Sequence, residues 1–300
     1  MKKTISLILC ILLAISFCGC GKKAPEDTGK LKITATIFPL YDFARQIAGD
    51  KAEVKMLLPT GAEVHSYEPS PRDIITVRES DLFINLGMDS DPWTLPVIND
   101  AKGLNVLSVM EGMDVLNEKH HHHEGAVDID PHIWTSPKNV KVISEKICDK
   151  LSSLDTENAQ YYRKNTQKYI EKLNALDEKF IKLTDKNNRK IVFADRFPFK
   201  YFADTYNIEY YAAFPGCSSE SEPSAATVAT LIDTIKKEKI PVVFYTETSN
   251  KQLAKAVCEE TGAEMMLFHS CHSVNDEELR KGITYLDLMG ENYKVLQKAI

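Results

Sequence analysis

Apolar and polar positions alternate in a regular way from residue 31 to about residue 135. Short runs of apolar and β-branched residues are each followed by a segment of helical periodicity, which predicts alternating strands and helices. Such alternation is typical of parallel sheets whose strands are joined by crossover helices. The predicted strands are residues 31–38, 52–59, 81–87 and 104–109, and the predicted helices are residues 39–49 and 70–80.

Both of these helices have recognisable ends. Pro39 lies near the start of the first helix and Gly49 at its end. In the second helix, Ser70 can cap the N-terminus and Pro71 suits the first turn. Asp73 stands where a capping box requires an acid.

The middle of the chain, residues 136–187, has only helical periodicity. One apolar stripe recurs at steps of three, four and seven residues: Tyr162, Tyr169, Leu173, Leu176, Phe180 and Leu183. Neither Gly nor Pro interrupts this stripe. We therefore expect one stiff helix of about 28 residues, roughly 40 Å long.

A second alternating half follows. Its predicted strands are residues 190–195, 208–214, 241–247 and 263–270, and its predicted helices are 200–206, 224–239, 250–262 and 276–300. The whole pattern predicts an α/β fold of two similar lobes with parallel sheets flanked by helices, joined by one long backbone helix. The predicted segments are an N-terminal lobe (31–140), a helical region (141–187) and a C-terminal lobe (188–300). Ligands of open α/β sheets bind at the carboxyl ends of strands, so we expect a cleft between the lobes, with small closure on binding.

The N-terminus reads as a targeting segment. Residues 1–19 contain two lysines and then an apolar run too short to span a membrane, which predicts a signal peptide. Cys20 follows Gly19 as in a bacterial lipoprotein cleavage site, with Cys18 as the competing lipidated residue and ordinary secretion as the alternative. Residues 20–30 would then be a lipidated cysteine and a flexible tether. We expect an extracytoplasmic protein held at the cell membrane by lipid, facing the periplasm in a Gram-negative cell.

Charge and cysteine content narrow the classes of function. The formal net charge is -6 and there is no basic block, which argues against a nucleic-acid partner. Outside the leader the cysteines are Cys148, Cys217, Cys258 and Cys271, whose spacing fixes no disulfide pairing. Cys148 and Cys258 fall on helical patterns and are expected to be plain buried thiols.

Two histidines occupy loops between a strand and a helix. His65 lies in "LPTGAEVHSYEPSPRD" and His132 in "DIDPHIWTSP". Neutral imidazole is the commonest metal ligand in proteins. Two such residues on loops of the predicted cleft favour a metal site over two unrelated surface histidines.

Three motifs carry a family resemblance. "PTGAEVHSYEPSPRD", "DPHIWTSPKN" and "NAQYYRKNTQKYIEKLNALD" resemble the metal-binding lipoproteins of zinc and manganese ABC importers, and the resemblance covers nearly all of residues 31–300. It implies two α/β lobes joined by a rigid helix, with His65 and His132 binding a divalent ion between them. It also implies a receptor that delivers zinc to the membrane subunits of an ABC permease. We expect a monomer.

The remaining ligands depart from the family pattern. The implied third position falls on Arg196, whose guanidinium has no lone pair to offer, while the adjacent Asp195 is a weaker candidate. The implied fourth position falls near Ser270, where His272 and then His269 are the favoured ligands.

The loop "FPGCSSESEPS" also borders the implied site. Its Cys217 is either a metal ligand or the partner of Cys271 in a disulfide. Arg196 would pair with an acid, for which Asp195, Asp204 and Glu222 are the candidates.

The tract "KHHHHE" contains His120, His121, His122 and His123. It is similar to the mobile histidine-rich loop of the zinc-importing members, and a short His tract is a compositional metal signal. We interpret it as a low-affinity collector separate from His132, with an inert polar loop as the alternative. Together with the His and Cys residues near Ser270, it favours Zn²⁺ over Mn²⁺.

Other classes of function make different demands. A manganese or iron receptor of the same family is the near alternative, and a surface adhesin a more distant one. A zinc hydrolase would need an open coordination position beside a general base, for which Glu68 and Glu222 have no distinguishing context. The chain has no H-E-x-x-H, no G-x-S-x-G and no Gly-rich phosphate loop, so we expect no enzymatic activity.

Overall fold

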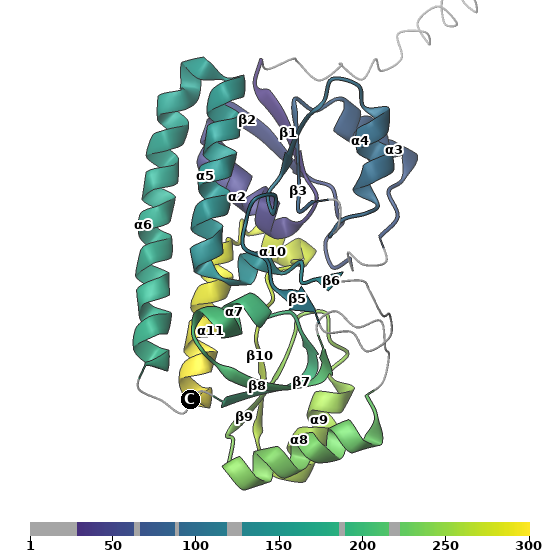
Figure 1. Ribbon diagram of the computed structural model, residues 1–300, viewed down its shortest axis with the longest axis vertical. Coiled ribbons are helices and arrows are strands. Elements are labelled where there is room, and N and C mark those ends of the chain that lie inside the picture. Colours follow the sequence, from purple (N-terminus) through teal and green to yellow (C-terminus); the bar gives the residue numbers. More distant parts are fainter. Residues whose placement is uncertain (1–28, 63–66, 88–89, 119–127, 186–189, 216–222) are drawn as a thin grey trace, which may run out of the picture. The chain divides into compact units, whose positions relative to one another are not determined.

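The computed structural model describes residues 29–62, 67–87, 90–118, 128–185, 190–215 and 223–300. Residues 31–300 form one compact unit. Within the described residues, this unit contains two four-stranded sheets and one short hairpin (Figure 1).

The first sheet is parallel throughout, with the strand order β2-β1-β3-β4. The strands are β1 (Leu31–Ala35), β2 (Ala52–Met56), β3 (Leu82–Asn85) and β4 (Asn105–Ser108), and the helices are α2 (Phe38–Ala48), α3 (Pro71–Arg78) and α4 (Thr94–Asp100). All four strands occur where the sequence predicts them. Helix α4 was not predicted. At the start of α3, the predicted capping box between Ser70 and Asp73 is formed.

Gly49 ends α2 for two physical reasons. Its φ of +56° lies in the left-handed region, which disfavours residues that have a Cβ. A Cβ placed on it would also lie 2.4 Å from the Tyr161 hydroxyl of the neighbouring long helix. The end of α2 therefore packs closely against that helix.

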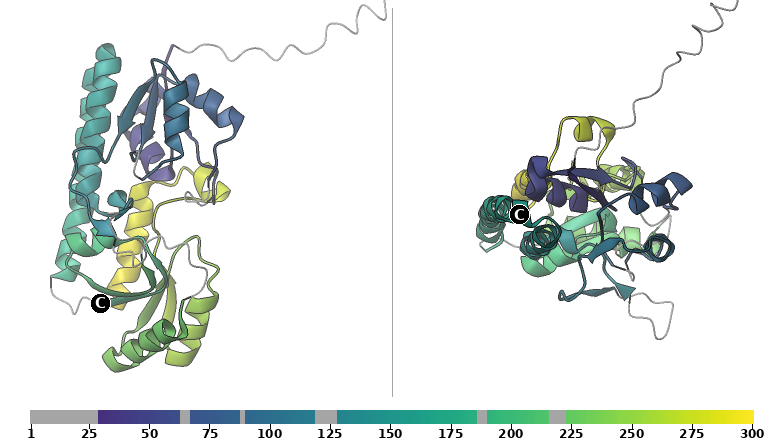
Figure 2. Two further views of the ribbon diagram at one scale, coloured as in Figure 1. Left: turned by 45° about the vertical axis from the view of Figure 1, so that its right-hand side comes forward. Right: turned by 90° about the horizontal axis from the view of Figure 1, so that it is seen from above.

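Two helices follow the first lobe: α5 (Pro137–Leu154) and α6 (Ala159–Thr184). The predicted long helix is α6, which has 26 residues and runs beside α5 (Figures 1 and 2). Its predicted stripe is buried at Tyr162, Tyr169, Leu173, Leu176 and Phe180. Helix α6 contacts both α2 and the C-terminal helix, so it is packed against elements from both ends of the chain.

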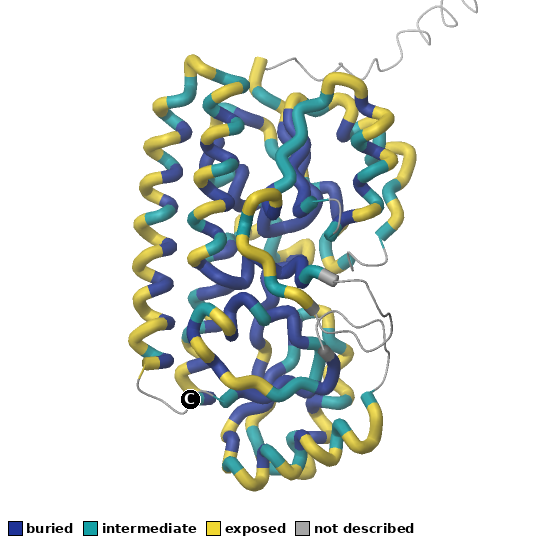
Figure 3. Tube along the Cα trace, viewed as in Figure 1, coloured by how far each residue is buried: buried dark blue, intermediate teal, exposed yellow. Residues whose placement is uncertain are grey.

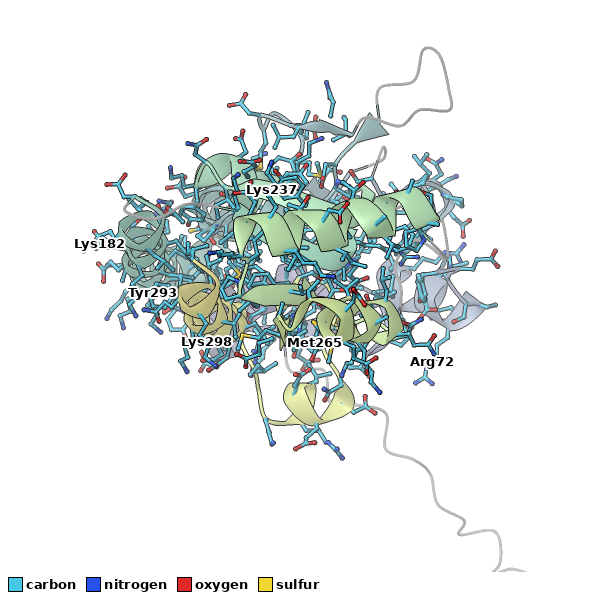
Figure 4. All side chains as sticks on the ribbon, turned by 90° about the horizontal axis from the view of Figure 1, so that it is seen from below. Arg72, Lys182, Lys237, Met265, Tyr293 and Lys298 are labelled. Carbon is cyan, nitrogen blue, oxygen red and sulfur yellow. The ribbon has the colours of Figure 1, made fainter. Side chains whose placement is uncertain are left out.

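The second sheet is also parallel, with the order β10-β9-β7-β8. The strands are β7 (Lys190–Phe197), β8 (Glu209–Pro215), β9 (Val242–Tyr245) and β10 (Glu264–Leu267), and the helices are α7 (Lys200–Thr205), α8 (Ala225–Glu238) and α9 (Gln252–Thr261). At the edge strand β10, the side chains of Met265 (labelled in Figure 4) and Leu267 are partly exposed. Figure 3 shows that burial is greatest along the inner strands, which are β1 and β3 in the first sheet and β7 and β9 in the second.

The prediction of one helix over residues 276–300 is wrong. The chain forms α10 (Asp276–Arg280) and α11 (Tyr285–Ala299), separated by a turn in which Gly282 has a φ of +71°. Thr284 then caps α11 through a capping box with Asp287, so the second helix has its own start signal.

A buried charge network joins α2 to the start of α11. Asp42 accepts hydrogen bonds from Arg45 Nε (2.7 Å) and from the Tyr285 backbone N–H (2.7 Å). The Arg45 guanidinium also donates to the carbonyls of Gly282 and Ile283. Burial raises the pKa of Asp42 above its ordinary value, although these donors act in the opposite direction.

A short antiparallel hairpin, which the sequence did not reveal, connects the first lobe to α5. It consists of β5 (Asn117–Glu118) and β6 (Asp128–Ile129). The hydroxyl of Tyr201, on α7, accepts from the Leu116 N–H (3.0 Å) and donates to the Asp130 carbonyl (2.9 Å). One side chain therefore holds both ends of the hairpin.

Candidate metal centre

His132 lies in a completely buried loop between β6 and α5. Its Nδ1 is 2.8 Å from Asp130 Oδ1, and the same oxygen accepts the His132 backbone N–H at 2.8 Å. A carboxylate behind a histidine holds the proton on the nearer nitrogen and orients the ring. This contact therefore prepares Nε2 of His132 to bind a metal ion.

His272 comes to the same place from the loop that follows β10. The ring centres of His132 and His272 are 5.9 Å apart, and both residues are buried. Two imidazoles bound to one tetrahedral zinc ion have ring centres about 5 Å apart, given Zn–N distances near 2.0–2.1 Å. A small adjustment of either ring would thus let both bind one ion.

Trp134 fills the space beside both imidazoles. Its ring lies 5.3 Å from that of His132 and 5.2 Å from that of His272, measured between ring centres. Its Nε1 donates to the Ser270 carbonyl (2.9 Å), and its own carbonyl accepts from the Tyr285 hydroxyl (2.9 Å). Trp134 therefore supports the two histidines and links their loops.

The other donors predicted in the loop after β10 have local partners. His269 Nδ1 accepts from the Cys271 N–H (2.9 Å) and is 3.5 Å from a Glu247 oxygen. Cys271 is a fully buried free thiol, and Cys217, the disulfide partner that the sequence left open, lies outside the described residues. Burial raises the pKa of this thiol well above its ordinary value.

Glu247, which sequence reasoning did not select, holds this loop from the end of β9. Its two oxygens accept from the Ser270 N–H (2.8 Å), the Ser270 hydroxyl (2.6 Å) and the His272 N–H (3.3 Å). On the opposite side, Asn292 of α11 accepts the His269 N–H and donates to the His269 carbonyl, both at 2.7 Å.

His65 lies outside the described residues, but the chain on each side of it is described. Before it, the Gly61 N–H donates to Ser273 Oγ (2.9 Å) and to the Val274 carbonyl (3.0 Å), directly after His272. After it, the Tyr67 ring packs edge-on against Trp93. Both approaches to His65 are therefore held, one of them next to the His272 loop.

Several further predicted residues lie outside the described residues: Cys20, His120, His121, His122, His123, Cys217 and Glu222. The histidine tract lies in the sequence between β5 and β6, and β6 ends one residue before Asp130. Cys217 comes two residues after the end of β8. Of the cysteines predicted as plain thiols, Cys148 is buried and Cys258 is half-buried.

Asp195 is already engaged. One of its oxygens accepts from the Thr246 N–H and hydroxyl, both at 2.8 Å, and the other accepts from the Arg196 N–H (2.8 Å). Arg196 lines a pocket of about 480 Å³ at the carboxyl ends of β7 and β8, together with Thr248, Ser249 and Asn250. None of the described histidines lines this pocket.

Within the described ranges, no group of three or more His, Cys, Asp or Glu side chains is arranged to hold a metal ion. The described part of the centre is therefore a pair of imidazoles, of which that of His132 has Asp130 behind it.

Among the helices of the described ranges, none is both long enough and apolar enough to cross a membrane.

Comparison with known proteins places this chain in a family. The family model described as zinc-uptake complex component A, periplasmic, matches residues 33–299. The zinc-binding lipoprotein AdcA of Streptococcus pneumoniae is 31% identical over 99% of this chain, which spans only 61% of that protein. The high-affinity zinc uptake system protein ZnuA of Bacillus subtilis is 29% identical, covering 97% of this chain and 95% of its own.

The fold agrees with this assignment. The crystal structure of the Zn(II)-bound ZnuA-like domain of S. pneumoniae AdcA superposes with a TM-score of 0.77 at 29% identity, covering 90% of this chain and 99% of that one. The family model covers both sheets and the helices that join them. The chain therefore belongs to the zinc-uptake complex component A family, whose members are extracytoplasmic solute-binding components of transport systems and not enzymes.

Proposed function

We propose that this chain is the zinc receptor of an ABC importer, which captures Zn²⁺ outside the cytoplasm and delivers it to a membrane permease. The observation that carries the proposal is the pair of buried imidazoles, His132 and His272, with Asp130 orienting the first. Family membership and the zinc-binding and zinc-uptake roles of its relatives AdcA and ZnuA support the same conclusion.

The donor set favours zinc over manganese. Imidazole nitrogen suits zinc, whereas manganese prefers carboxylate, carbonyl and water oxygens. In this proposal His132 and His272 bind the ion with His65, and Cys217 is the candidate for the remaining position. His269 is a reserve candidate, because its Nδ1 already accepts a backbone hydrogen bond.

Two devices outside the described residues complete the proposal. Cys20 would carry the lipid that keeps the receptor at the membrane. The histidines 120–123 would collect zinc weakly near the strand that leads to His132. The permease is the partner that a receptor of this kind requires.

The test is a calorimetric titration of the purified metal-free protein with zinc and then with manganese. We expect one tight zinc site in the unchanged protein. Loss of a residue that only supports a metal ligand weakens binding by up to about 100-fold. His132→Ala and His272→Ala remove proposed ligands, so each should weaken zinc binding by more than this. Replacing the four tract histidines by alanine should leave the tight site and remove weak binding. Tighter binding of manganese, or a tight site that survives both alanine changes, would show that the proposal is wrong.

A further inference from the structure

The carboxylate of Glu247 faces a loop of a different strand. Glu247 lies just after β9, and its side chain is only 12% exposed. Its oxygens bind Ser270 and the His272 backbone, 23 and 25 positions further along the chain.

We propose that Glu247 is a positioning residue of the metal site, which fixes the backbone at residues 270–272 so that the His272 imidazole faces His132. This inference rests on the proposed function only where it concerns metal affinity. Its structural part, the hold on the loop, stands on the three hydrogen bonds alone.

The loop needs such a hold because its backbone is strained. Cys271 has a φ of +61°, in the left-handed region that L-residues other than glycine rarely occupy. Such a conformation persists only where the surroundings over-determine it. Here the two neighbours of Cys271 are held by one carboxylate, which contacts Ser270 on one side and His272 on the other.

The position requires an acceptor on both oxygens. Two backbone N–H groups and one hydroxyl converge on Glu247, and an ionised carboxylate only accepts hydrogen bonds. A glutamine of the same shape would turn its NH₂ toward the N–H of Ser270 or toward that of His272. Either orientation leaves one backbone donor facing another donor.

The same chemistry occurs elsewhere in the chain and supplies a control. Asp287 accepts from the N–H (3.0 Å) and the hydroxyl (2.6 Å) of Thr284, as Glu247 does from those of Ser270. Asp287 caps α11, and its described hydrogen bonds go to Thr284 and not to the histidine loops. Glu247→Gln and Asp287→Asn therefore make the same change of charge on the same kind of hydrogen bond.

The experiment compares these two variants with the unchanged protein in three measurements. Zinc affinity is measured by competition with a chromophoric chelator, zinc dissociation by stopped flow, and amide hydrogen exchange at Ser270 and His272 in the metal-free protein. We expect Glu247→Gln to lose about 10- to 100-fold in zinc affinity through faster dissociation, and to lose protection at the two amides. Asp287→Asn should lower the unfolding temperature while leaving zinc affinity and both amides unchanged.

Equal zinc affinity in Glu247→Gln and the unchanged protein, or unchanged protection at both amides, would overturn the inference. An equal loss of affinity in Asp287→Asn would also overturn it, because the effect would then be general destabilisation. If Glu247→Gln does not fold, Glu247→Asp keeps the charge but shortens the side chain, and loss of protection at Ser270 and His272 tests the same hold. If the unchanged protein binds no zinc, the proposed function fails, while amide exchange still decides the role of Glu247.

Discussion

The two histidine loops are built in opposite ways. His132 is oriented by Asp130, which lies two residues before it, so ligand and support belong to one short segment. The His272 loop is held by Glu247 from β9, by Asn292 from α11 and by Trp134 from the loop of His132. The carboxylate that orients His132 comes from its own loop, although Tyr201 and Tyr285 also bind the backbone of that loop. The side chains that hold the His272 loop come from other elements.

This difference has an energetic side. Contacts between residues close in sequence cost little chain entropy, while contacts across many residues require the intervening chain to be ordered first. The orientation of the His132 ring by Asp130 should therefore respond little to changes elsewhere in the fold. The His272 side should respond to changes that remove the contacts of Glu247 or Asn292 with its loop.

Asn292→Ala should have the largest effect on stability, because it breaks the distant support of the His272 loop. It leaves the buried N–H and carbonyl of His269 without their partner, at a cost of at least about 1–3 kcal/mol. Chemical denaturation of the metal-free protein measures this cost.

The matched change is Asn139→Ala, in the first turn of α5, which breaks a contact with the His132 loop. Asn139 donates only one hydrogen bond, to the Ile133 carbonyl (3.1 Å), from a half-buried position. We expect a smaller loss, about 0.5–1.5 kcal/mol. If Asn139→Ala costs as much as Asn292→Ala, the proposed contrast between local and distant support does not hold.

Asp130→Asn tests the local support with little disturbance of shape. The amide oxygen can still accept both hydrogen bonds from His132, so the free energy of unfolding should change little. The negative charge behind the imidazole is lost, and zinc affinity should fall about tenfold. Chelator competition measures the affinity, and an unchanged value would mean that Asp130 only shapes the loop.

The smallest expected effect is a pH dependence from Asp42, which supports the start of α11. Its pKa is raised in the folded protein, first because of burial, so the folded state binds its proton more tightly than the unfolded state. Stability from this group is therefore full below the ordinary value of 3.8 and falls as pH rises through the raised folded pKa.

Asp42→Asn should remove this slope. Denaturation of both proteins from about pH 4 to about pH 7 gives the comparison, since carboxyls other than Asp42 titrate alike in both. Asp73 and Asp155, whose pKa values are lowered, contribute a slope of the opposite sign that cancels in the difference. If Asp42 is the source, the stability of the unchanged protein relative to Asp42→Asn falls as pH rises. A relative stability that rises with pH would show that Asp42 is not the source.

Most of the fold could be predicted from the sequence, because its strands are short apolar runs and α3 has a complete capping box. The sequence also contains signals for the break between α10 and α11, namely Gly282 and the capping spacing of Thr284 and Asp287. We predicted one helix there because the apolar periodicity continues on both sides of the break.

Only part of the candidate metal centre could be predicted from the sequence. His132 and His272 were selected, and the structure brings them together. Asp130 stood beside His132 in the sequence, but only the contact at 2.8 Å shows its role. Glu247 follows a strand without any local pattern, and its importance arises from a contact with residues far along the chain. His65, Cys217 and the histidine tract stay predictions.

Because of the β5–β6 hairpin, the histidine tract can change in length without a change in the geometry around His132. Residues 119–127 lie in the sequence between β5 and β6, and Tyr201 binds Leu116 just before the first strand and Asp130 just after the second. The entropy of closing a loop grows slowly with its length, so doubling the number of residues there costs only about 0.6 kcal/mol. Insertions and deletions at this point are therefore nearly neutral for folding. In the proposed function, the collecting tract can therefore change in length while the contacts around His132 stay the same.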